Sequence, residues 1–153
     1  MAAILTADDL YNTWKRVRDH HLEQTREVVS RETAWRNIPI EWISSISLEA
    51  PELWKGLEAH CTLVLRENQK INLVSRKSPE EQIRDNAFDG ILLGLILYHV
   101  SRETEQRNLL LDAGSGSGVP GIPALLAMRA LDPSRPYELV MIDANIKKQD
   151  FLA

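Results

Sequence analysis

The stretch that decides the fold is Leu109-Leu-Leu-Asp-Ala-Gly-Ser-Gly-Ser-Gly-Val-Pro-Gly-Ile-Pro123. It begins as a short apolar run that ends in Asp112, passes through three alternate glycines, and leads into an apolar segment from about Pro120 to Leu131. A second apolar run, Leu139 to Ile142, follows and ends in Asp143. A strand, a glycine-rich turn, a helix and a second strand make a βαβ unit, in which the two strands are parallel. The sequence therefore predicts an α/β fold.

The glycine-rich turn is a candidate ligand site. Gly114, Gly116 and Gly118 allow a tight bend and let a ligand lie directly on the main chain, because no Cβ intervenes. Asp143, at the tip of the second strand, is placed to accept hydrogen bonds from ribose hydroxyls. Asp112 stands two residues before the first glycine, where its carboxylate can pair with an ammonium group. Together these residues predict a cradle for an adenosine cofactor.

Two cofactor classes compete for this turn. The stretch from Gly116 to Gly121 fits the G-x-G-x-x-G dinucleotide fingerprint, in which a pyrophosphate sits on the helix N-terminus. Asp112 would repel a pyrophosphate, and Pro120 and Pro123 remove two N–H donors from the first helical turn. S-adenosylmethionine carries an ammonium and a ribose but no phosphate, so the pattern favours it. An NAD(P)-dependent oxidoreductase is the less favoured alternative.

The remaining sequence has a helical pattern. Helices are expected from Thr6, from Ser47–Pro51 to Asn68, from Ser78 to about Ser101, and from Ile146 onward. Cys61 lies on the apolar stripe of the second of these, which indicates a packing residue. We expect a helical N-terminal region over residues 1–108 and the start of a cofactor-binding domain over residues 109–153.

Composition excludes several classes of protein. The 153 residues are 44% apolar and carry a net charge of -4, so the chain is not a bulk polycation and would need a local patch to contact nucleic acid. The longest apolar run, Ile91 to Tyr98, is far shorter than the roughly 20 residues of a membrane span. One cysteine excludes an internal disulfide and suits the cytoplasm. No metal site is expected, since the spacing of the four histidines is not that of metal ligands: His20, His21, His60 and His99.

The segment from Asp112 to Pro123 closely resembles the cofactor motif of the small-subunit ribosomal RNA methyltransferase G family, also called GidB. The Pro-Gly-Ile-Pro continuation separates this family from other class I methyltransferases. Further similarity covers about Pro51 to Ala153, in four short stretches: Asn68-Gln-Lys-Ile-Asn-Leu73, Ser78-Pro-Glu-Glu81 with Phe88-Asp89, Ile142-Asp143, and Lys147-Lys148 with Phe151-Leu152. Within the family pattern, Asp85-Asn86 replace the usual Arg-His, and Val119 replaces Phe or Leu.

The resemblance implies a Rossmann-like fold and methyl transfer from S-adenosylmethionine to N7 of a guanine in 16S rRNA of the small ribosomal subunit. Gly114 and Val119 would contact the cofactor, Gly116 and Gly118 would shape the loop, and Asp112 and Asp143 would hold its ammonium and ribose. Guanine N7 has a lone pair and no proton to lose, so positioning carries most of the catalysis and no catalytic residue is singled out. Full-length members are expected to be monomeric.

The length of the chain sets a further expectation. A complete methyltransferase sheet has more strands than the two that this sequence supplies, so we expect a C-terminally truncated member with an incomplete sheet and little or no methyl-transfer activity. A non-catalytic remnant that binds only cofactor or a partner is the alternative. Leu139 to Ile142 should then leave an open apolar edge.

Overall fold

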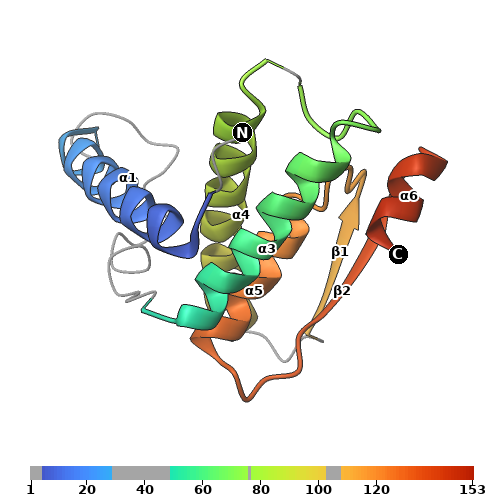
Figure 1. The fold of residues 1–153 in the computed structure, drawn as a ribbon. Helices are drawn as coiled ribbons and strands as arrows, with labels where there is room; N and C mark the ends of the chain where they lie inside the picture. The colour runs from blue at the N-terminus through green and yellow to red at the C-terminus, as the bar shows by residue number, and fades with distance from the viewer. Residues whose placement is uncertain (1–4, 29–48, 76, 103–107) are drawn as a thin grey trace.

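The computed structural model describes residues 5–28, 49–75, 77–102 and 108–153. Within these ranges the chain forms five helices and two strands (Figure 1). In chain order they are α1 (Ala7–Val28), α3 (Pro51–Glu67), α4 (Pro79–Arg102), β1 (Leu109–Ala113), α5 (Gly121–Leu131), β2 (Glu138–Ile142) and α6 (Ile146–Leu152).

The two strands confirm the predicted parallel pairing. Leu109 of β1 lies opposite Glu138 of β2, and Ala113 lies opposite Ile142, so both strands end at the same edge of the sheet. Helix α5 connects them, as a βαβ unit requires. The glycine-rich turn and Asp143 therefore meet at the carboxyl edge, because each directly follows a strand.

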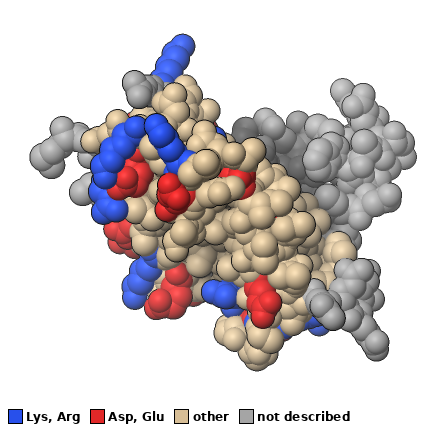
Figure 2. All heavy atoms as spheres, turned by 90° about the vertical axis from the view of Figure 1, so that its right-hand side faces the viewer, with Lys and Arg blue, Asp and Glu red and all other residues tan. Residues whose placement is uncertain are grey.

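One helix covers one face of the sheet. α5 packs on β1 and β2, and α3 and α4 lie on the other side of α5, away from the strands (Figure 1). The second face of the sheet is open: Leu111 is 66% exposed and Ile142 is 50% exposed. Figure 2 looks from the side of the molecule that carries the sheet and α6, and its centre is covered mostly by uncharged residues. The expected exposure of apolar β2 residues is confirmed at Val140 and Ile142.

Helices α1, α3 and α4 form the apolar core that supports this unit. Trp14 of α1 is buried and meets Phe88 of α4 edge to face, with ring centroids 5.6 Å apart. Cys61 is fully buried, which confirms its interpretation as a packing residue, and burial raises the pKa of its thiol to about 12. No helix in the described part of the chain is both long enough and apolar enough to cross a bilayer.

Helices α4 and α5 approach closely because small residues face each other. A Cβ placed on Gly94 would lie 2.5 Å from the carbonyl oxygen of Ala124 and 2.8 Å from its Cα. A Cβ on Gly90 would meet Pro123 at 2.7 Å. These contacts are with backbone or with a rigid ring, so neither can move aside. The helical region is thereby joined directly to the βαβ unit.

The close contact predicts that Gly94→Ala lowers the free energy of unfolding by about 2 kcal/mol, because an added methyl group forces the two helices apart. Gly56→Ala is the matched control. Its Cβ would meet only the side-chain methyls of Leu126, at 3.0 Å, and the helix gains about 1 kcal/mol in propensity. Urea unfolding of both variants measures the difference, and equal stability of the two would contradict the packing argument.

Candidate functional site

The loop that follows β1 is tied to the end of β2. The backbone N–H groups of Gly114 and Ser115 both donate to the carbonyl oxygen of Ile142, at 2.7 and 3.0 Å. The Ser115 hydroxyl donates to the carbonyl oxygen of Asp112 at 2.8 Å, and Gly118 N donates to Ser115 O at 2.7 Å. Ser115 is buried and central to this network. The sequence pattern does not single out Ser115, because the glycines dominate it.

The three alternate glycines all adopt left-handed backbone conformations, with φ of +85° at Gly114, +56° at Gly116 and +86° at Gly118. Residues with a side chain rarely adopt these angles, so the loop needs glycine at each position. A Cβ on Gly114 would meet nothing within 4 Å, which leaves open space above its backbone. Gly118 faces the interior instead, where a Cβ would meet Ile122 at 2.5 Å and His60 at 3.2 Å.

Asp143 holds the loop from the end of β2. Its Oδ2 accepts from Gly116 N at 2.8 Å, and its Oδ1 accepts from Asn145 N at 2.8 Å. The hydrogen bonds from Asn145 and Gly116, with the nearby charge of Lys148, lower the pKa of the Asp143 carboxyl. The group is therefore ionised at neutral pH. Each carboxylate oxygen has a second lone pair, which can accept from a ligand hydroxyl.

Asp112 is the fourth residue of β1, and its side chain turns to the start of α5. Its Oδ2 accepts from Gly121 N at 3.2 Å, and a Cβ on Gly121 would lie 2.6 Å from this oxygen. A carboxylate is favourable there, because the N-terminus of a helix carries partial positive charge. The glycine at position 121 is required by the close approach of Asp112.

The loop opens onto a cavity of about 240 Å³. Of the residues predicted from the sequence, Gly114, Gly116 and Val119 line this cavity, together with Ser115 and Ser117. Three other predicted residues support the loop from outside the lining: Asp112, Gly118 and Asp143. The structure thus brings the predicted residues together around one loop, but separates those that face the cavity from those that support the loop.

The opposite wall of the cavity comes from the helical region. It consists of Leu73, Val74 and Ser75, which follow α3, and of Gln82 and Asn86 on α4. Sequence reasoning did not identify these residues as part of a site. The signals were the family-like segment that ends at Leu73 and the family position at Asp85-Asn86, and nothing in their spacing shows which residues face the loop.

His60 of α3 is buried beneath the loop. It is 6% exposed, and its Nε2 has no hydrogen-bond partner among the described residues. Burial lowers its pKa to about 4, so the ring is neutral at pH 7. No group of three or more histidine, cysteine or acidic residues in the described part of the chain could hold a metal ion. The side chains of His20 and His21 lie outside that part.

The lowered pKa of His60 predicts a loss of stability in mild acid. Between about pH 6.5 and pH 4 the unfolded chain binds a proton that the folded chain does not, so the free energy of unfolding falls by about 3 kcal/mol as the pH drops through this window. His60→Phe removes this contribution. Urea titrations at pH 7.5 and 4.5 measure it, and an unchanged pH dependence in the variant would show that another group is responsible.

Comparison with known proteins gives a consistent result. A family model described as rRNA small subunit methyltransferase G matches residues 54–153. The chain is similar to the ribosomal RNA small subunit methyltransferase G of Nitrosomonas eutropha, with 32% identity over 114 residues, or 74% of this chain and 46% of the relative. The protein of the same name from Nitrosococcus oceani is 36% identical over 99 residues, or 64% of this chain and 39% of the relative.

A third relative of that name, from Pelodictyon phaeoclathratiforme, is 41% identical over 83 residues, which cover 54% of this chain and 32% of the relative. The chain therefore spans less than half the length of these curated relatives. No solved structure matches the chain.

Proposed function

Because the chain belongs to the rRNA small subunit methyltransferase G family, we propose that it binds S-adenosylmethionine and serves methyl transfer to N7 of a guanine in 16S rRNA. The observation that carries the proposal is the glycine loop at the carboxyl edge of β1 and β2. Gly114 leaves open space there, and Asp143 presents an ionised carboxylate beside it.

We assign the cofactor to the six residues predicted from the sequence, of which three line the cavity and three lie beside or behind the loop. Gly114, Gly116 and Val119 line the cavity, so the methionine portion can lie on the main chain. Asp143 has lone pairs left for the ribose hydroxyls, and Asp112 supplies a carboxylate toward the ammonium, directly or through water. Gly118 holds the loop against α3 and α5. Bound S-adenosylmethionine supplies an electrophilic methyl group on its sulfonium.

A dinucleotide fits the start of α5 poorly. Binding of a pyrophosphate at a helix N-terminus needs free backbone N–H groups. Here Gly121 N donates to Asp112, Ile122 N donates to Gly118 O at 2.8 Å, and Ala124 N donates to Pro120 O at 3.0 Å. Pro123 has no N–H. The first turn of α5 therefore has no donor left for a phosphate, which favours the methyltransferase over an oxidoreductase.

The residues of this chain act by positioning. Guanine N7 carries an available lone pair and no proton, so no general base is required. The loop holds the methyl donor in one orientation because three of its N–H groups are fixed on the end of β2 and on Asp143. What remains for the protein is to bring N7 into line with the methyl group and to exclude water.

The proposal extends to the organisation of the chain. We take the βαβ unit as the start of a Rossmann-like methyltransferase domain over residues 109–153, preceded by a helical region over residues 1–108. The small ribosomal subunit is the proposed partner, the cytoplasm the proposed location and a monomer the proposed state of the whole protein. A chain that binds cofactor without transferring methyl groups is the alternative. Titration with S-adenosylmethionine followed by a methylation assay on 30S subunits separates the two.

Isothermal titration tests the cofactor assignment. The chain is expected to bind S-adenosylmethionine and not NADH. Asp143→Asn should weaken binding tenfold or more. Gly116 N and Asn145 N donate to different carboxylate oxygens, and the amide replaces one of these oxygens with an NH2 group that cannot accept. The variant also loses the charge that favours ribose hydroxyls. Glu138→Gln makes the same charge change at the other end of β2 and should leave binding unaltered.

Gly114→Ala is a second probe of the same loop. Its φ of +85° strains any residue with a Cβ, and the added methyl group enters the space assigned to the cofactor. We expect the variant to remain folded, with binding reduced at least tenfold. Binding of NADH by the wild-type chain, or no binding of S-adenosylmethionine, would refute the proposed function.

A further inference from the structure

The second wall of the cavity faces the glycine loop across open space. It is formed by Leu73, Val74, Ser75, Gln82 and Asn86. We propose that this wall binds the guanine that accepts the methyl group, with Asn86 as the residue that recognises it. The inference rests on the proposed function. Because one cavity touches both walls, a base held on this wall lies against whatever the loop carries.

The wall is built as a fixed surface. Leu73 N and Val74 N both donate to Asn68 Oδ1, each at 2.9 Å, and Ser75 N donates to Gln82 Oε1 at 2.8 Å. Asn68 is 6% exposed, so it is committed to this task. The backbone N–H groups of three consecutive residues are thereby held by two amide side chains. One belongs to Asn68 at the end of α3, and the other to Gln82 on α4. Asn68 and Gln82 are positioning residues for the wall.

These hydrogen bonds also determine which chemical groups of a ligand can bind to the wall. The backbone N–H groups of Leu73, Val74 and Ser75 are all occupied, while their carbonyl oxygens accept no hydrogen bond from the described residues. Among the described residues that line the cavity, none is Lys or Arg. The wall offers a carboxylate no free backbone N–H group and no cation, only side-chain donors such as the amide of Asn86, so it is poorly suited to the carboxylate of an amino acid. Guanine presents N–H donors at N1 and N2, which such a wall can accept.

Asn86 completes the recognition. Its side chain lines the cavity, is half-buried and makes no hydrogen bond to any described residue. An amide carries one acceptor and two donors, so it can donate to guanine O6 and accept from N1–H at the same time. On guanine, O6 lies between N1 and N7. This pairing therefore leaves the N7 lone pair free, as transfer of a methyl group to N7 requires.

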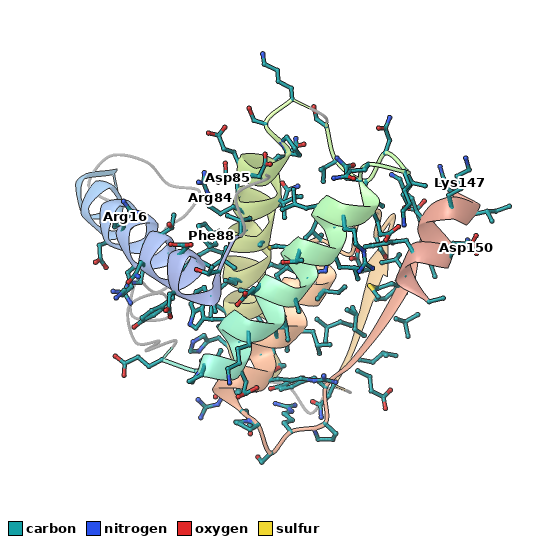
Figure 3. The ribbon with its side chains drawn as sticks, viewed as in Figure 1. Arg16, Arg84, Asp85, Phe88, Lys147 and Asp150 are labelled. Atoms are coloured by element: carbon teal, nitrogen blue, oxygen red, sulfur yellow. The ribbon has the colours of Figure 1, made fainter. Side chains whose placement is uncertain are left out.

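Two matched variants on α4 test the proposal. Asn86→Leu keeps the number and branching of the side-chain heavy atoms and removes both hydrogen-bonding groups. Asp85→Leu changes the neighbouring residue, which is ion-paired with Arg84 and lies on the α1 side of α4, outside the cavity lining (Figure 3). Guanosine is titrated into the chain saturated with S-adenosylhomocysteine, and S-adenosylmethionine is titrated into the free chain.

We expect Asn86→Leu to weaken guanosine binding roughly tenfold and to change S-adenosylmethionine binding less than twofold, with no effect of Asp85→Leu on either. Asn86→Asp provides a second variant of unchanged size, and its carboxylate should weaken guanosine binding by repelling O6. Guanosine binding that is absent from the wild type, or untouched by both Asn86 variants, overturns the proposal. An equal loss of S-adenosylmethionine affinity also overturns it, because the wall would then belong to the cofactor.

Failure of the proposed function gives a different pattern. In that case the wild-type chain binds neither S-adenosylmethionine nor S-adenosylhomocysteine. Guanosine titrated into the free chain and its Asn86 variants then still decides whether the wall recognises a guanine. The thermal unfolding of each variant is measured alongside, so that a loss of binding is compared only among folded proteins.

Discussion

The attachment of the glycine loop to the end of β2 is the interaction on which the rest of the site depends. Gly114 and Ser115 donate to the carbonyl oxygen of Ile142, and Gly116 donates to Asp143. Parallel pairing makes this possible, because it brings the carboxyl ends of both strands to one edge. Three consecutive N–H groups are thereby satisfied within the protein. The loop can turn its open side, at Gly114, toward a ligand without leaving its own donors unpaired.

The helical region contributes more than support for the βαβ unit. Gly90 and Gly94 let α4 approach α5 closely, and this contact places Asn86 opposite the loop. Asn68 then fixes the segment after α3 against the same cavity. The two regions of the chain meet at the cavity, and each supplies one wall. In Figure 3, Arg84 lies on the α1 side of α4, and Lys147 lies on α6 at the other side of the molecule. Lys148 of α6, in contrast, lies beside the loop, where its Nζ would be 3.9 Å from a Cβ on Gly116.

Much of the fold could be predicted because local patterns determine it. The apolar runs of β1 and β2, the alternate glycines between them and the proline at the start of α4 each act over a few residues, and each element formed close to its expected place. The wall could not be predicted. Whether Asn86 faces the cavity depends on the rotation of α4 against α5, which arises from contacts between residues about 30 positions apart. The sequence likewise gives no sign that His60 is buried, because its burial results from the packing of α3 beneath Gly118.

The sequence alone determined the βαβ unit, the conformation of the loop and the family. Glycine at three alternate positions and an acid at the carboxyl end of each strand leave few local alternatives. Only the tertiary structure separated the residues that line the cavity from those that hold the loop. Asp112 turned to the amide of Gly121, and Asp143 turned to that of Gly116. A carboxylate accepts hydrogen bonds from the nearest unpaired N–H groups. Which groups are nearest depends on how the helix packs against the strands.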